Sequence, residues 1–256
     1  MMEQPSGPDI HSAMFREAPS YWWAKSRREL VVKLWKRYRN HDCPNPRILD
    51  AGCGTGELLK MLEPEGQVFG LDCDPEALFF CKERGLSRVE AMDLESESLE
   101  KRYPHGMDLI TALDVLEHIE SDVSVLKSIW ETLHPRGLFI FTVPASPCLW
   151  SRKDVDLGHR RRYTLQQISR LLSSDRWKIH KLSYFVFFLS PLLWIGLRLK
   201  SKGWIQSPWL EAKMPHYPDT LNVLLCHLMR LENAWVYRGS FPWGASIVGV
   251  AEKNVL

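Results

Sequence analysis

The sequence predicts an α/β fold that is doubly wound around a seven-stranded sheet. Three observations support this fold class. Short apolar runs alternate with amphipathic runs from residue 47 to residue 144. The apolar runs are hydrophobic on both faces, as parallel strands are when helices cover both sides of a sheet. A turn with alternating glycines follows the first run, at residues 52–56.

The first predicted element is a helix over residues 20–39, where apolar residues recur at spacings of three and four. It ends before the two prolines of "HDCPNP" at residues 41–46. We expect this helix to fold over the functional site as a lid. The same patterns predict strands at 47–52, 67–72, 88–93, 107–114 and 137–144, and helices at 57–62, 75–85 and 122–133.

The pattern changes after Pro144. Residues 146–164 form a polar, basic loop in this interpretation, and Thr164 with Gln167 predicts a capping box at the start of a short helix. The remaining expected elements are two strands and a helical insertion between them, at 177–186, 245–253 and 187–240. The chain therefore divides into a tail with the lid helix, a core in two pieces and an insertion, at 1–44, 45–186 with 241–256, and 187–240.

Composition argues against several classes of protein and partner. The net charge is only +2 over 256 residues, so we expect no nucleic-acid partner. The six cysteines include no C-x-x-C pair, which argues against a metal site and for a reducing, cytoplasmic location. The first residues lack the basic and apolar regions of a secretory signal. The longest apolar run, residues 184–199, is shorter than the ~20 residues of a spanning helix.

The glycine turn carries the first functional signal. The strand ends in Asp50, and Gly52, Gly54 and Gly56 follow at alternate positions. A dinucleotide fingerprint needs its third glycine one residue later, where this chain has Glu57, and an acid at the strand end repels phosphate. Glycines let the backbone approach a ligand closely, and N–H groups at the next helix can bind a carboxylate. The pattern therefore favours the methionine end of S-adenosylmethionine.

A second acid follows the next predicted strand. Asp72 stands about 20 residues after the glycine turn, where doubly wound folds place a carboxylate that binds ribose hydroxyls. Asp74 directly precedes Pro75, and we interpret it mainly as a helix cap.

These segments, with "DLITALDVLEHIES" (108–121) and "LHPRGLFIFTVP" (133–144), resemble the motifs of the class I S-adenosylmethionine-dependent methyltransferases. The resemblance covers residues 45–145, and "YWWAKSRREL" and "GHRRRYT" also look like a bacterial subgroup associated with glycans, lipids and natural products. It implies a Rossmann-like fold in which the last strand of the seven-stranded sheet is antiparallel, S-adenosyl-L-methionine as cofactor and S-adenosyl-L-homocysteine as product. The cofactor contacts that it implies are Asp50, Gly52, Cys53, Gly54, Gly56, Asp72, Cys73, Asp93, Leu94 and Leu113.

The resemblance also implies roles for individual side chains. Asp93 would lie by the adenine amine with Leu94 against the ring; the alternative is a loop aspartate. Leu113 and Asp114 would lie nearest the sulfonium. His118 is four residues beyond Asp114, so on a helical turn the two share a face. His118 could then orient the substrate or act as a base. The alternative is that Glu117 and His118 are structural or touch the cofactor.

Aromatic and basic residues outside the core motifs complete the predicted site. Tyr21 and Trp22 on the lid helix could stabilise the sulfonium, although simple helix packing is the alternative. The "GHRRRY" segment could face an anionic acceptor or the lid; the alternative is a solvated basic loop. The catalytic candidates are Asp114, His118, His159 and Tyr163, and the substrate-binding candidates are Tyr21, Trp22, Arg161 and Arg162.

We therefore expect an enzyme that methylates a small molecule, at an oxygen of a polar or anionic acceptor. One alternative is methylation of a membrane-embedded quinone or lipid-linked acceptor, with peripheral membrane contact through residues 184–199. In the other interpretation the insertion roofs the pocket or forms a homodimer face. A further alternative is a regulatory module that binds S-adenosylmethionine without transferring the methyl group.

Overall fold

The computed structural model describes residues 15, 20–173, 175–202, 204 and 218–254, and confirms the predicted seven-stranded sheet. The strand order is β3-β2-β1-β4-β5-β7-β6. Strands β1 to β5 pair in parallel, and β7 runs antiparallel to both β5 and β6. The strands are β1 (Arg47–Ala51), β2 (Gln67–Asp72), β3 (Val89–Ala91), β4 (Met107–Leu113), β5 (Leu133–Pro144), β6 (Trp177–Phe185) and β7 (Ser246–Lys253).

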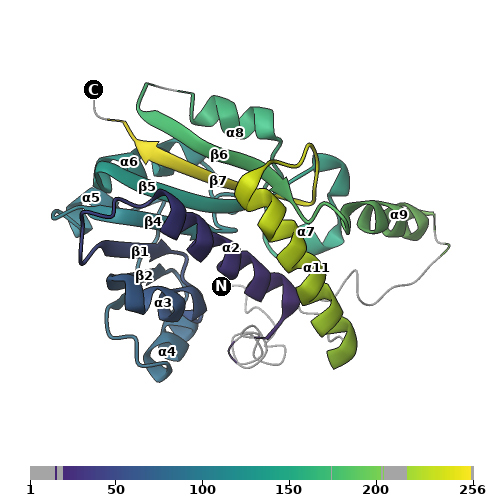
Figure 1. The fold of residues 1–256 in the computed structure, drawn as a ribbon, viewed down its shortest axis with the longest axis horizontal. Helices are drawn as coiled ribbons and strands as arrows, with labels where there is room; N and C mark the ends of the chain where they lie inside the picture. Colours follow the sequence, from purple (N-terminus) through teal and green to yellow (C-terminus); the bar gives the residue numbers. More distant parts are fainter. Residues whose placement is uncertain (1–14, 16–19, 174, 203, 205–217, 255–256) are drawn as a thin grey trace, which may run out of the picture.

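Helices cover both faces of this sheet (Figure 1). The purple helix α2 and the yellow-green helix α11 cross one face side by side, and α9 extends away from the sheet. The α-helices are α2 (Trp22–Tyr38), α3 (Glu57–Leu62), α4 (Pro75–Glu83), α5 (Leu99–Arg102), α6 (Asp122–Thr132), α7 (Arg152–Asp156), α8 (Leu165–Leu171), α9 (Ser190–Ser201) and α11 (Asp219–Arg238).

Alternation along the central strands separates two apolar layers. In β5, Leu138 and Ile140 point to the layer under α2, α3 and α11, whereas Phe139 and Phe141 point to the layer under α6 and α8. All four side chains are buried. The sheet is thus fully covered in its middle, and its polar groups gather at the carboxyl ends of the strands.

Helix α2 is anchored to the sheet and to α11 by buried contacts. Leu30, Leu34 and Trp35 of α2 are buried in the layer that it shares with the sheet. The Asn233 side chain of α11 donates to the carbonyl of Ser26 at 2.7 Å, in a buried position. A lid function of α2 stays a prediction. The expected loose tail at residues 1–19 lies outside the described residues, except for Phe15.

Three local expectations were wrong. Strand β5 starts at Leu133 rather than at residue 137, because Leu133 already pairs with Met107. The register after this pair is irregular, and the positive φ of Arg136 permits it. The expected loop at 146–164 contains α7, whose start is a capping box of Ser151 and Asp154. Asp114 and His118 do not share one helical turn, because Asp114 has a φ of 56° and the hydrogen-bonded turn starts only at Val115, whose carbonyl accepts from the His118 N–H at 3.0 Å.

The insertion between the last two strands is helical, as predicted, in its described parts. Helices α9 and α11 form it, and no described helix is both long and apolar enough to span a membrane.

Candidate active site

The sheet order reverses between β1 and β4, and doubly wound folds bind ligands in the crevice beyond the carboxyl ends of such strands. The glycine turn follows β1 at this edge, and Asp114 follows β4. The topology therefore brings the two predicted halves of the site together.

The glycine turn depends on left-handed backbone conformations. Gly52, Gly54 and Gly56 have φ angles of 83°, 53° and 85°. A Cβ on Gly52 would meet a methyl of Val115 at 2.5 Å, so the turn presses against the segment after β4. A Cβ on Gly54 would meet nothing within 4 Å. The backbone at Gly54 is therefore open to a ligand.

Asp72 at the end of β2 holds this turn in place. Its carboxylate accepts hydrogen bonds from the Gly54 N–H at 2.8 Å and from the Asp74 N–H at 3.0 Å. Asp74 caps α4 by accepting from the Glu76 N–H at 2.9 Å, which confirms its predicted capping role. The ribose contact of Asp72 stays a prediction.

Asp50 lies beneath the turn and is almost fully buried. The hydroxyl of Thr111 donates to it at 2.6 Å. Burial raises the pKa of Asp50 to about 7, because the hydrogen bond from Thr111 only partly offsets the loss of hydration. Its carboxyl is therefore engaged by the neighbouring strand β4.

The other predicted cofactor contacts have mixed surroundings. Asp93 is exposed and accepts from the Glu95 N–H at 2.9 Å and the Ser96 hydroxyl at 3.0 Å, so it organises its own turn. Leu94 and Leu113 are half-buried. Cys53 is buried, Cys73 is exposed, and all six cysteines are free thiols.

Asp114 connects three elements of the site. It forms an ion pair with Arg27 of α2 and accepts a hydrogen bond of 2.8 Å from the Thr142 hydroxyl of β5. The sequence analysis missed Arg27, which shares the helix with the buried Leu30 and Leu34. Its position on the polar side of an amphipathic helix gave no signal of a partner 87 residues away.

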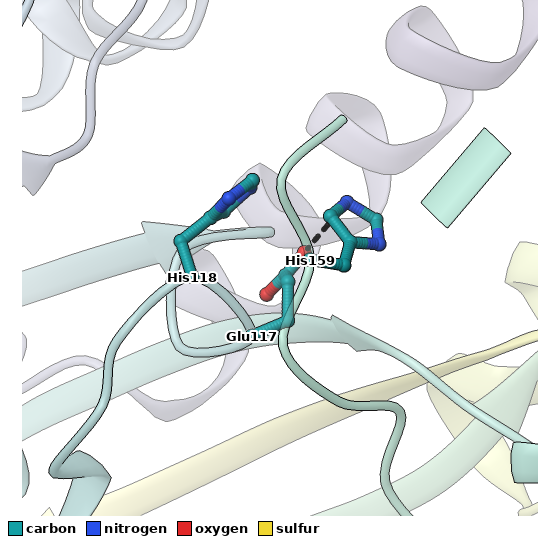
Figure 2. A group of neighbouring side chains, drawn as sticks. All are labelled: Glu117, His118 and His159. Atoms are coloured by element: carbon teal, nitrogen blue, oxygen red, sulfur yellow. Dashed lines mark ion pairs between the residues drawn. The ribbon is translucent and has the colours of Figure 1, made fainter. Parts of the chain in front are cut away.

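A cluster of Glu117, His118 and His159 lies next to Asp114 in the chain (Figure 2). Glu117 and His118 come from the segment after β4, and His159 comes from the segment after α7. Glu117 is 0% exposed, and His159 Nε2 lies 3.9 Å from its Oε1. The two imidazole rings meet edge to face, with centroids 4.9 Å apart.

Burial and neighbouring charges shift the acidities in this cluster. Burial, followed by the charge of Asp114, holds the pKa of Glu117 well above its usual range. Burial, followed by the nearby His159, lowers the pKa of His118. Both histidines were among the predicted catalytic residues, whereas Glu117 was expected to be structural or to touch the cofactor.

Asp154 of α7 organises the histidine segment, and the sequence analysis missed it. This buried carboxylate bonds to His159 Nδ1 at 3.1 Å and accepts from Arg162 Nε at 2.8 Å. Burial acts to raise the pKa of Asp154, but the hydrogen bonds and the charge of Arg162 outweigh it and lower that pKa to about 2. The Ser-x-x-Asp spacing of the capping box was the available signal.

The remaining basic and aromatic candidates have internal partners. Arg161 pairs with Asp122 at 3.3 Å, and Arg162 pairs with Asp154. Tyr163 is buried, and its hydroxyl donates to Asp122 at 3.0 Å. The segment is therefore not a fully solvated basic loop, and contact of these residues with an acceptor stays a prediction.

The two aromatic residues at the start of α2 differ in exposure. Tyr21 is half-buried, whereas Trp22 is buried and donates its backbone N–H to the Asn222 side chain at 2.9 Å. Their rings lie 5.9 Å apart, and both pack against the layer under α2 and α11.

Comparison with known proteins agrees with this geometry. Residues 49–139 match the family model described as a methyltransferase domain. A ubiquinone biosynthesis O-methyltransferase of Xanthomonas campestris is 28% identical over 192 residues, which is 72% of this chain and 76% of that protein. The enzyme of that name from Leptothrix cholodnii is 29% identical over 107 residues, 40% of this chain and 46% of its own. The chain thus spans about half the length of some relatives that it matches.

Solved structures share the fold. An S-adenosylmethionine-dependent methyltransferase from Clostridium acetobutylicum has a TM-score of 0.58 at 14% identity, covering 96% of this chain and 97% of its own. The plantazolicin methyltransferase BpumL in complex with SAH has a TM-score of 0.58 at 15% identity, covering 98% and 92%.

The family model identifies a methyltransferase domain at residues 49–139, and the fold is one that S-adenosylmethionine-dependent methyltransferases share. The cofactor of this domain is S-adenosylmethionine. The residues of this chain fit it, because the open backbone at Gly54 lies directly beside the Asp72 carboxylate.

Proposed function

We propose that this protein transfers a methyl group from S-adenosylmethionine to a hydroxyl oxygen of a small molecule. The observation that carries the proposal is the meeting of two features at one edge of the sheet. The glycine turn with Asp72 offers a cofactor cradle, and the Glu117–His118–His159 cluster stands in the segment that follows the adjoining strand β4.

The cofactor supplies an electrophilic methyl group on a sulfonium with a good leaving group. The protein therefore contributes mainly position and alignment. In our proposal the glycine turn and Asp72 hold the methionine and ribose parts, and Asp114 borders the reacting centre. A hydroxyl acceptor must also lose its proton, and the Glu117–His118–His159 cluster removes it. His118 is the base candidate that the sequence singled out.

The choice of oxygen as the acceptor atom draws on the relatives, which are named O-methyltransferases. A polar acceptor suits the carboxylate and imidazoles of the cluster. An anionic acceptor has less support, because Arg161 and Arg162 are paired with Asp122 and Asp154.

Two measurements test the proposed function. Isothermal titration should show binding of S-adenosylmethionine, and a panel of hydroxylated acceptors should yield S-adenosylhomocysteine with at least one of them. Absence of binding at millimolar ligand would sink the proposal. Binding without turnover on any acceptor, with phenols and lipophilic hydroxyls included, would favour the regulatory module.

A membrane-associated acceptor is a second candidate, and helix α9 favours it. Leu192, Trp194 and Ile195 of α9 are 66%, 43% and 46% exposed. Arg198 and Lys200 follow in its last turn, as in helices that lie at a membrane surface. The names of the relatives refer to ubiquinone biosynthesis, and we propose a lipophilic acceptor on that basis.

Vesicle flotation tests this second candidate. The protein should float with vesicles that contain anionic lipid, and Trp194→Glu should abolish flotation without changing Tm, because the side chain is exposed. If the wild type does not float, and sedimentation shows a dimer that Trp194→Glu disrupts, the surface is a homodimer face instead.

A further inference from the structure

The Glu117–His118–His159 cluster has a property that a simple base does not need. Each residue presents one ligand atom, and these atoms all lie within 4.8 Å of one another. Figure 2 shows them converging from two separate segments of the chain. Two imidazole nitrogens and one carboxylate oxygen are ligands that zinc and other transition ions accept.

Glu117 is the independent observation that points to a ligand. Its side chain is fully buried, and neither carboxylate oxygen has a hydrogen-bond partner among the described residues. A buried carboxylate without a donor is costly, whether it is charged or neutral. A cation bound at this place would remove that cost.

His159 is already oriented as metal-binding histidines usually are. Its Nδ1 bonds to the buried carboxylate of Asp154 at 3.1 Å, and its Nε2 faces Glu117. A second carboxylate behind a histidine fixes the ring and leaves the other nitrogen free for the ion. Arg162 and Ser151 in turn hold Asp154 in place.

The geometry points to a divalent transition-metal site formed by Glu117, His118 and His159, with Asp154 as the carboxylate behind His159. Ligands to zinc lie about 2.0–2.2 Å from the ion in a tetrahedron, so neighbouring ligand atoms are about 3.3–3.6 Å apart. The ligand atoms here lie within 4.8 Å of one another, and rotation of the exposed His118 side chain would bring them closer together.

Three protein ligands leave one position open, as in catalytic zinc sites. This inference rests on the proposed function and deepens it, because the acceptor hydroxyl can take that position. The part of the cluster in removing the acceptor proton would then be to hold an ion that makes the hydroxyl more acidic, so that the O–H bond breaks and the proton passes to solvent. The oxygen then forms a bond to the methyl carbon while the carbon–sulfur bond breaks and its electron pair goes to sulfur.

Binding of the metal alone tests the site. Chelator-treated full-length protein should bind Zn²⁺ at a one-to-one ratio in isothermal titration, and Co²⁺ should give visible absorption bands of low-symmetry coordination. Glu117→Gln and His118→Asn should each weaken Zn²⁺ binding by about a hundredfold or more, since each removes a direct ligand. His180→Asn is the matched control, because His180 pairs with Glu252 at 2.7 Å on the neighbouring strand β7.

The control variant should bind Zn²⁺ as the wild type does. If Glu117→Gln does not fold, His118→Asn decides alone, because His118 is exposed and lies in an irregular segment. Failure of the wild type to bind Zn²⁺ or Co²⁺ overturns the site, and so does unchanged affinity in the ligand variants. The titrations contain neither methyl donor nor acceptor, so they measure metal binding separately from methyl transfer. If the protein transfers methyl groups but binds no metal, this inference is overturned and the proposed function stands.

Discussion

Gly54 illustrates how a single residue prepares the site for its cofactor. Its φ is 53°, and the space where a side chain would stand is open. The neighbouring glycine, Gly52, has no such space, because Val115 lies 2.5 Å from the position of a Cβ. The two glycines therefore serve different purposes: Gly52 allows the turn to pack, and Gly54 leaves room for a ligand.

The Gly54→Ala variant should lose both cofactor affinity and a modest amount of stability. The methyl group enters open space, so the expected cost is only the left-handed strain of about 1–2 kcal/mol. The same methyl occupies the space beside Asp72, so we expect the Kd for S-adenosylmethionine to rise about tenfold or more, a change of about 1.4 kcal/mol. Isothermal titration and urea unfolding measure the two effects.

Gly85→Ala is the matched control for that variant. Gly85 has a φ of 81° and also has nothing within 4 Å of a Cβ, but it lies at the end of α4. It should lose similar stability and keep the cofactor affinity. Equal Kd values for the two variants would contradict the assignment of the open space to the cofactor.

Asp50 should make the stability of the protein depend on pH. Its pKa is about 7 in the folded state and about 3.9 in an unfolded chain. Between these values the folded protein keeps a proton that the unfolded chain has released, so the free energy of unfolding falls as pH rises. The slope reaches about 1.4 kcal/mol per pH unit, and the loss is complete above the folded pKa.

The Asp50→Asn variant should remove this slope and can still bond to Thr111. Its stability relative to the wild type should therefore increase between about pH 5 and about pH 8, as measured by urea unfolding. Asp156→Asn, at an exposed position, controls for the loss of a charge. Parallel curves for the wild type and Asp50→Asn would refute the raised pKa.

At the scale of elements, the contact between α2 and the end of β4 matters most for function. Arg27 on α2 pairs with Asp114, and both side chains are largely covered, with 17% and 26% of their surface exposed. The ion pair joins helix α2, which precedes β1 in the chain, to the predicted reacting centre. It fixes the Asp114 carboxylate together with Thr142.

The Arg27→Met variant should therefore impair activity and also lower stability. Met keeps much of the apolar packing of the arginine stem, but Asp114 loses its charged partner. We expect kcat/KM to fall by about tenfold or more with a loss of about 1–3 kcal/mol in stability. Activity assays and urea unfolding provide both values.

Arg37→Met on the same helix is the control. Arg37 donates to the carbonyl of Tyr237 on α11, away from the site. It should leave kcat/KM unchanged. An equal loss of activity in both variants would mean that α2 acts only through its general docking.

At the scale of the whole molecule, the cofactor should stabilise the fold. The turn that would hold it joins β1, β2 and the segment after β4, so a ligand there binds the folded chain alone. At about 100 times its Kd it should add about 2.7 kcal/mol. That corresponds to a rise in Tm of about 5–10 °C for a chain of this size.

Scanning calorimetry measures this rise, and S-adenosylhomocysteine should produce a similar one because it keeps the same contacts. Adenosine alone should give a smaller shift. A Tm that does not change with any of these ligands would contradict cofactor binding at the glycine turn.

Much of this architecture was predictable from local signals. Apolar runs predicted all seven strands, and the Thr164–Gln167 capping box predicted the start of α8. Asp72 was predicted as a site residue because it ends the strand next to the glycine turn, and doubly wound folds bind ligands at the carboxyl ends of their strands. By contrast, the Ser151 capping box of α7 was present in the sequence but was overlooked inside a polar segment.

The sequence alone determined the fold class and the cofactor, because hydrophobic periodicity and glycine spacing are patterns among residues that are close together in the chain. Only the tertiary structure decided the partners of the functional side chains. Arg27 pairs with Asp114, and Asp154 bonds to His159. Glu117 is buried without a hydrogen-bond donor among the described residues. These contacts depend on how distant segments pack. A local pattern cannot carry them, because a side chain's charge and hydration are set by whichever neighbours the completed fold places around it.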